Sequence, residues 1–147
     1  GRGEIFNLGG VNTKILLVKN PTGYNVILES LSQKKLVKST PILLALNDNL
    51  ADGTDVSWIW DVDFNYLKYQ KAPIIVSGIR AKDLQLRLKY AGVRSSKITL
   101  EPNLKKALNL LKKQASPSAY ILPTYTAMLS LRKILVKQKL IHSTWKD

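Results

Sequence analysis

Short apolar runs alternate along this chain with longer stretches in which apolar residues recur at helical spacing. Five such runs, at 14–19, 42–46, 74–76, 97–100 and 119–122, are expected to be buried strands. Neighbouring parallel strands need a crossover connection, and a helix usually supplies it. The alternation therefore predicts an α/β fold with a Rossmann-like, doubly wound and mostly parallel sheet, flanked by helices on both faces.

Cap and breaker residues set the expected helix boundaries. Thr22 is expected to cap the first helix with its hydroxyl. Gly92 is expected to end a helix over 81–91, since glycine readily takes the left-handed conformation that closes a helix. Further helices are predicted over the lysine-rich stretch 104–113 and from about Pro123 onward.

The chain has 147 residues, no cysteine and one histidine. This length suits one domain that buries roughly 70% of its unfolded surface without disulfides or a structural metal. We expect a single domain over 1–147, with 1–12 as a linker that leads into it and 141–147 as a tail. The absence of an initial methionine suggests a piece cut from something longer. Zinc sites and thiol chemistry built on cysteine are excluded within the chain, and no bound metal is expected.

Basic residues outnumber acidic residues by 23 to 10, which gives a net charge of +13. Such a charge favours polyanions or anionic membrane surfaces as partners. One interpretation open at this point is a nucleic-acid or anionic-surface binding module without catalysis. No nucleic-acid motif or set of stacking aromatics accompanies the charge, so no specific nucleic acid is expected. No apolar run of about eighteen residues occurs, and we expect a soluble, intracellular chain.

Half of the acidic residues fall in one short segment after the run 42–46. They are Asp48, Asp52, Asp55, Asp61 and Asp63. The segment 48–63, called the acidic segment below, contains no Lys or Arg but does contain Trp58 and Trp60. Aspartate is a turn former, which explains any single one of these residues. Several carboxylates beside two indoles, at a strand end where doubly wound sheets bind ligands, instead indicate a site or an interface.

Three chemical roles fit this segment to different degrees. A calcium loop fails, because Leu50 occupies a ligand position and Ile59 stands where the bidentate glutamate belongs. A self-contained pair of carboxylates, Asp55 with Asp61, remains an alternative. The third role is that of a triad aspartate, which orients a histidine serving a nucleophile. Because the single histidine, His142, lies in the tail, that histidine would come from another polypeptide.

Five stretches of the sequence resemble one family. They are GRGE at 1–4, KNPTGYN at 19–25, LNDNLADGTDVSWIWDVDF at 46–64, SGIRAKDLQLRLKYAG at 77–92 and LPTYTAML at 122–129. Together they resemble the C-terminal domain of MurT, the Mur-ligase-like subunit of lipid II isoglutaminyl synthase, over nearly the whole chain. The resemblance implies a fold of the Mur ligase C-terminal-domain type. The sequence departs from the family pattern at Thr54 and Asn65.

The resemblance implies a two-subunit enzyme of peptidoglycan biosynthesis. In that family MurT pairs with GatD, a glutaminase subunit that frees ammonia from glutamine with a cysteine and a histidine. The ligase subunit activates the D-glutamate α-carboxyl of lipid II with ATP and amidates it. ATP and Mg²⁺ are expected in the central domain of the full-length protein, and no cofactor in this domain, which has no G-x-x-x-x-G-K-[ST] loop. The resemblance also implies a cytoplasmic location at the inner face of the membrane, and inactivity of the isolated domain.

Roles for individual residues follow from the same resemblance. Asp55 matches the family position that completes the Cys-His-Asp triad across the subunit interface. Asn20 and Asn47 are implied to face the nucleotide or substrate of the central domain. Partner-interface or supporting roles are expected for Asp48, Asn49, Asp52, Gly53, Trp58 and Asp61.

Overall fold

Six strands form one mixed sheet in the computed structural model, which describes residues 3–33, 39–114 and 116–142. The strands are β1 (Glu4–Leu8), β2 (Val11–Ile15), β3 (Ile42–Ala45), β4 (Ile74–Ser77), β5 (Ile98–Leu100) and β6 (Ser118–Pro123). Their order across the sheet is β1-β2-β6-β3-β4-β5. Every neighbouring pair is parallel except β1 with β2. The predicted mostly parallel α/β sheet is confirmed.

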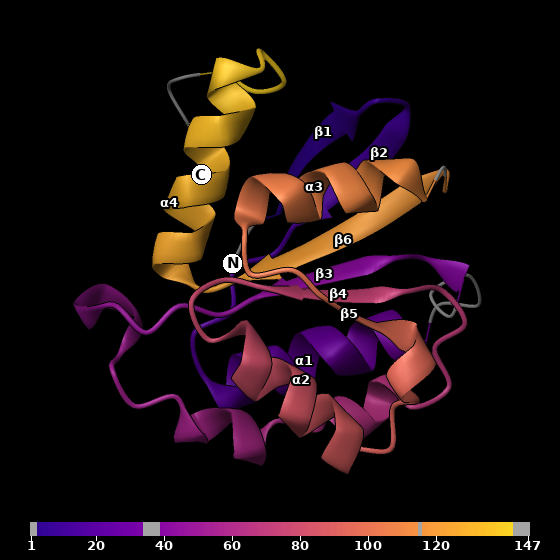
Figure 1. The fold of residues 1–147 in the computed structure, drawn as a ribbon, viewed down its shortest axis with the longest axis vertical. Coiled ribbons are helices and arrows are strands. Elements are labelled where there is room, and N and C mark those ends of the chain that lie inside the picture. Colours follow the sequence, from indigo (N-terminus) through magenta and orange to yellow (C-terminus); the bar gives the residue numbers. More distant parts are fainter. Residues whose placement is uncertain (1–2, 34–38, 115, 143–147) are drawn as a thin grey trace.

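Helices cover both faces of the sheet (Figure 1). They are α1 (Pro21–Ser32), α2 (Ala81–Tyr90), α3 (Leu104–Lys113) and α4 (Tyr125–Lys137). Helices α1 and α2 lie on one face, and α3 and α4 lie on the other. Within the described ranges, no helix combines the length and apolar character needed to cross a membrane.

The central strands are apolar throughout because both of their faces are buried. In β3, Ile42 and Leu44 belong to the core formed with α1 and α2. Leu43, between them, belongs to the core formed with α3 and α4. Side chains alternate across a strand, so a strand between two helical layers reads as a continuous apolar run.

The first strands correct the expectation of a linker over 1–12. Residues 4–8 form β1, which pairs with β2 in a hairpin, and residues 1–2 lie outside the described residues. Gly9 and Gly10 make the turn with φ of +58° and +95°. Two-residue hairpin turns favour glycine because both central residues take positive φ. The sequence signal was this Gly-Gly pair between two segments of alternating apolar residues.

The first parallel strand also begins earlier than expected. A strand was predicted over 14–19, whereas β2 spans Val11–Ile15 because its pairing with β1 sets its start. Beyond Ile15 the backbone still follows β6, and the Val18 N–H donates to the Pro123 carbonyl at 3.0 Å.

Two helix caps differ from the prediction and one agrees with it. Asn20, rather than Thr22, caps α1, since its Oδ1 accepts the Gly23 N–H at 2.8 Å. Pro123 is the last residue of β6, so α4 begins two residues later. Gly92 has φ of +93° directly after the C-cap of α2, as expected for a residue that closes a helix.

The acidic segment is folded into short 3₁₀ helices between β3 and β4. These are η2 (Leu50–Asp52), η3 (Ser57–Asp61) and, after the segment, η4 (Phe64–Leu67); a further one, η5 (Ser95–Lys97), precedes β5. Val56, Ile59 and Val62 are buried in the core with α1 and α2. These apolar anchors hold the polar residues between them in fixed positions.

The chain end after α4 is described as far as His142, which is exposed. The rest of the expected tail, 143–147, with Trp145, lies outside the described residues.

Candidate functional site

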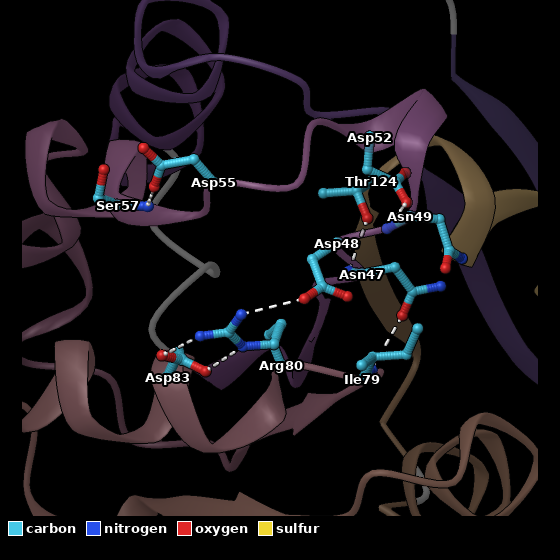
Figure 2. A network of polar contacts seen from close by, with 10 residues as sticks. All are labelled: Asn47, Asp48, Asn49, Asp52, Asp55, Ser57, Ile79, Arg80, Asp83 and Thr124. Atoms are coloured by element: carbon cyan, nitrogen blue, oxygen red, sulfur yellow. Dashed lines mark hydrogen bonds and ion pairs between the residues drawn. The ribbon is translucent and has the colours of Figure 1, made fainter.

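The carboxyl ends of β3, β4 and β6 meet at one edge of the sheet, where Asn47 joins them (Figure 2). The Asn47 backbone N–H donates to Oγ1 of Thr124, just beyond β6, at 3.0 Å. Its Oδ1 accepts the Ile79 N–H at 2.9 Å, and its Nδ2 donates to Oγ1 of Thr126 at 3.0 Å. Asn47 is only 5% exposed. It therefore fixes three strand ends relative to one another.

Asp52 holds the first part of the acidic segment against the start of α4. Its Oδ1 accepts the Thr126 N–H at 2.8 Å, and its Oδ2 accepts the Thr126 hydroxyl at 2.5 Å and the Asn49 N–H at 3.1 Å. The N-cap residue of α4, Thr124, makes no side-chain cap of its own. The first N–H groups of a helix need acceptors, and a carboxylate also suits the positive end of the helix dipole. Asp52 therefore supplies, from a segment distant in sequence, the side-chain acceptor for the helix N-terminus that Thr124 does not provide.

Asn49 and Gly53 complete this turn. Asn49 Nδ2 donates to Oγ1 of Thr126 at 3.0 Å, so that hydroxyl accepts two hydrogen bonds and donates one, which is its full capacity. Gly53 has φ of +90°, a conformation that favours glycine, and leads the chain out of η2 toward Asp55. Both residues shape the segment from within, and their expected contacts with a partner stay a prediction.

Arg80, at the start of α2, ties Asp48 to that helix. Its Nη1 lies 3.0 Å from Asp48 Oδ2, and its Nε and Nη2 donate to the two oxygens of Asp83 at 2.7 and 3.1 Å. Hydrogen bonds to Asp83, and then to Asp48, raise the pKa of Arg80, and the bond from Arg80 lowers the pKa of Asp83. Sequence reasoning named Asp48 but missed Arg80 and Asp83. Their three-residue spacing, just beyond the carboxyl end of β4, was the available signal.

Asp55 is exposed, in contrast to these residues, and is held by one neighbour (Figure 2). Its Oδ1 accepts the Ser57 N–H at 2.9 Å. This backbone hydrogen bond, and after it one from the Ser57 side chain, lowers the pKa of Asp55 below its usual range. The side chain is therefore an ionised carboxylate at neutral pH, fixed in direction by Ser57 and open to solvent.

A concave pocket of about 240 Å³ lies beside this carboxylate. Its lining residues are Thr54, Asp55, Val56, Ser57, Ile59, Trp60, Arg80 and Asp83. Drug-sized ligands usually occupy pockets of about 300–1,000 Å³, so this one is better matched to a side chain than to a whole substrate. Asp61, the other member of the carboxylate-pair alternative, is exposed on η3 and is not among the lining residues.

The two tryptophans of the acidic segment face in different directions. Trp58, the expected interface residue, is half-buried against the core, with its ring centroid 6.2 Å from that of Tyr24. Trp60 is 46% exposed and stacks edge-to-face on Tyr90, with centroids 5.5 Å apart. The sequence named Trp58 as a partner-interface or supporting residue, and its contact with a partner stays a prediction. The sequence alone does not tell which indole faces the core. Because η3 is a 3₁₀ helix, α-helical spacing from buried Val56 and Ile59 does not predict the direction of its side chains.

Arg87 of α2 supports the exposed tryptophan. Its guanidinium carbon lies 5.2 Å from the Trp60 ring centroid, and its Nε and Nη2 donate to the carbonyls of Ile59 and Val62 at 3.0 and 2.7 Å. The guanidinium is thus fixed to both ends of the turn that carries Trp60. We call Trp60, Arg87 and Tyr90 the aromatic platform.

Asn20 is the N-cap of α1 and lies at the same edge of the sheet. It is exposed, and its Oδ1 is engaged by Gly23. The other residue implied to face a nucleotide, Asn47, is buried with both ends of its amide engaged. The two side chains do not form a phosphate-binding loop, and a nucleotide-facing role for them stays a prediction.

Comparisons with known proteins point to one family. Residues 17–128 match a family model described as MurT ligase C-terminal. A protein of Streptococcus pneumoniae (strain ATCC BAA-255 / R6), named lipid II isoglutaminyl synthase (glutamine-hydrolyzing) subunit MurT, is 37% identical over 142 residues, which are 96% of this chain and 31% of that protein. Proteins of the same name from Staphylococcus aureus strains COL and N315 are each 46% identical over 97 residues, or 63% of this chain and 21% of theirs. The chain thus spans less than a third of the length of these curated relatives.

Proposed function

This chain belongs to the MurT ligase C-terminal family, and we propose that it acts as the C-terminal domain of the ligase subunit of a lipid II isoglutaminyl synthase. In this proposal it docks a GatD-type glutaminase subunit and supplies Asp55 to the active site of that subunit. The observation that carries the proposal is Asp55 itself, an exposed carboxylate of fixed direction beside a pocket of side-chain size.

Asp55 has the properties that a triad aspartate needs. A triad aspartate stays ionised, accepts a hydrogen bond from the histidine and stabilises the imidazolium that forms during the reaction. Ser57 keeps the pKa of Asp55 low, its N–H engages Oδ1, and the carboxylate is exposed to solvent (Figure 2). The exposed carboxylate can accept an N–H from an imidazole of another protein.

In the proposed reaction the histidine and the nucleophile belong to the glutaminase subunit. The histidine takes the proton of the cysteine thiol, and the thiolate attacks the side-chain amide carbon of glutamine. The histidine returns the proton to the leaving nitrogen, so ammonia departs and an acyl-enzyme remains for hydrolysis to glutamate. Asp55 takes no proton in these steps; it orients the imidazole and offsets its positive charge.

The aromatic platform supports the docking part of the proposal. Trp60 lines the Asp55 pocket, and Tyr90 is 73% exposed beside it. Interface residues that contribute most to binding are enriched in Trp, Tyr and Arg, and they contribute most when they are already rigid. Arg87 and the stacked rings give such rigidity next to Asp55.

The remaining chemistry is proposed for parts of the protein beyond this chain. ATP and Mg²⁺ would be bound by a central domain, and the complex would amidate the D-glutamate α-carboxyl of lipid II with the ammonia released. We place this reaction in the cytoplasm at the inner face of the membrane. The contribution of this chain is the docking surface and one carboxylate, so we expect the chain alone to be inactive.

The decisive experiment replaces Asp55 with Asn in the complete two-subunit complex. We expect glutamine hydrolysis to fall by about 10⁴-fold, as for loss of the aspartate from a serine protease triad, with assembly unchanged on size-exclusion chromatography. Glu29→Gln is the matched control, because it neutralises an exposed carboxylate on α1 that does not line the pocket. Unchanged hydrolysis in the assembled Asp55→Asn complex would refute the proposal.

A further inference from the structure

A second pocket lies at the amino ends of β4 and β5, at the opposite end of these strands from the Asp55 site. Its volume is about 370 Å³. Its lining residues are Lys68, Tyr69, Gln70, Lys71, Arg94 and Lys97. Lys71 lies in the loop before β4, and Lys97 directly precedes β5. This pocket has no part in the function proposed above.

Four cationic residues line this pocket, and no carboxylate is among the described residues that line it. Lys and Arg are charged at neutral pH. Like charges that face one concave space repel each other, and an anion among them removes the repulsion and adds attraction. The pocket therefore has the electrostatics of an anion site, in contrast to the acidic pocket that holds Asp55 and Asp83.

The walls of the pocket are built into the fold. A Cβ on Gly92, which has φ of +93°, would lie 3.2–3.4 Å from the Cε, Cδ and Cγ of Lys68. The stem of Lys68 thus passes close over a position that only glycine fills without strain. Gln70 is 6% exposed, and its Nε2 donates to the Thr40 carbonyl at 2.7 Å, which fixes that wall. Tyr69, 70% exposed, has its ring centroid 5.6 Å from the Lys68 ammonium.

We propose that this pocket binds a diphosphate group. A guanidinium binds phosphate oxygens in a two-pronged geometry, and lysine ammonium groups are strong point charges for phosphate. One Arg and three Lys are more positive charge than a single carboxylate would balance, whereas a diphosphate carries several negative charges on adjacent groups. The exposed Tyr69 ring offers a face on which a flat group attached to the diphosphate can stack.

The test titrates the 147-residue chain with inorganic pyrophosphate by calorimetry and follows backbone amide signals by NMR. We expect saturable binding that weakens with salt, and signal changes confined to residues 68–71 and 92–97. Lys68→Ala with Arg94→Ala should weaken binding by at least about tenfold, because each removes a charge-assisted hydrogen bond. The matched control is Lys106→Ala with Lys113→Ala, which removes the same charge from the exposed face of α3 outside the pocket, and it should change affinity by less than about twofold.

A second titration, with ADP, distinguishes a nucleotide from a bare diphosphate. Tighter binding of ADP that Tyr69→Leu reduces to the pyrophosphate level assigns a nucleotide; equal binding of both probes assigns the diphosphate alone. The proposal is overturned if pyrophosphate does not saturate a site, or if the α3 control weakens binding as much as the pocket variant. All four substituted cations are exposed, so loss of folding is not expected to obscure the result.

Discussion

Asp52 and Asp55 are three residues apart in the same acidic segment, yet the fold uses them in opposite ways. Asp52 accepts hydrogen bonds from two backbone N–H groups and one hydroxyl, and these join η2 to the start of α4. Asp55 is exposed, and its described hydrogen-bond partner is its near neighbour Ser57. The indoles repeat the contrast, since Trp58 packs on the core and Trp60 faces solvent.

The difference shows which part of the acidic segment is structural and which is available to a partner. The first part, through Asp52, connects strand ends and a helix terminus, so its carboxylates serve the fold. The part around Asp55 and Trp60 is held by short-range contacts and by Arg87, and it leaves both side chains accessible. A cluster of like residues in a sequence can therefore contain two separate functions.

The largest expected effect on stability is that of Trp58→Ala. Removing an indole that packs on the core should lower the free energy of unfolding by about 2–3 kcal/mol, less than for a fully buried tryptophan. Trp60→Ala should cost less than about 1 kcal/mol, because the ring is 46% exposed. Urea unfolding of both variants measures the two values.

For partner binding, we expect the substitution of Trp60 to have the larger effect and that of Trp58 the smaller, the reverse of their effects on stability. Trp60→Ala is expected to weaken assembly with the glutaminase subunit by at least about 30-fold, the loss typical of a central interface aromatic. Trp58→Ala should leave assembly nearly unchanged at a temperature where the chain is folded. Calorimetric titration of the subunits gives both affinities, and equal losses would contradict the separation of an inward from an outward indole.

A smaller stability effect is expected for Asp52→Ala. The variant loses the acceptor for the α4 amide and for the Thr126 hydroxyl, so unfolding should become easier by about 2 kcal/mol. Asp55→Ala, the matched control, should leave the urea midpoint nearly unchanged, because the side chain is exposed. If urea unfolding gives the same loss for both, the described contrast between the two aspartates is wrong.

The layered fold was predictable because buried positions require apolar residues, which are visible in the sequence. Strands between two helical layers are apolar on both faces, so β3 and β4 stand out as short runs, and α3 was predicted with its observed bounds. Local choices between similar residues were harder. Asn20 and Thr22 are both good caps, and only the backbone geometry decides that Asn20 accepts the Gly23 N–H.

The candidate site was predictable as a place and less so as a set of contacts. The concentration of aspartates after β3 located it. The bonds that give each aspartate its surroundings come from distant segments: Asp52 meets Thr126, and Asp48 meets Arg80. Such pairings depend on which strands are adjacent. The amino-acid composition does not predict that β6, β3 and β4 are neighbours in this order.

The smallest predicted effect concerns the titration of Asp55. Its folded-state pKa is lowered, first by the Ser57 N–H and then by the Ser57 side chain, so folding favours the charged form. The resulting stabilisation is present above the unfolded pKa of about 3.9 and is lost as the pH falls through the lower folded value. NMR titration of the Asp55 carboxyl carbon should give a midpoint below the one measured in urea. A midpoint at or above the unfolded value would mean that Ser57 does not hold the carboxylate. In that case the loss of glutamine hydrolysis at acid pH would be assigned to protonation of Asp55 rather than to a group of the glutaminase subunit.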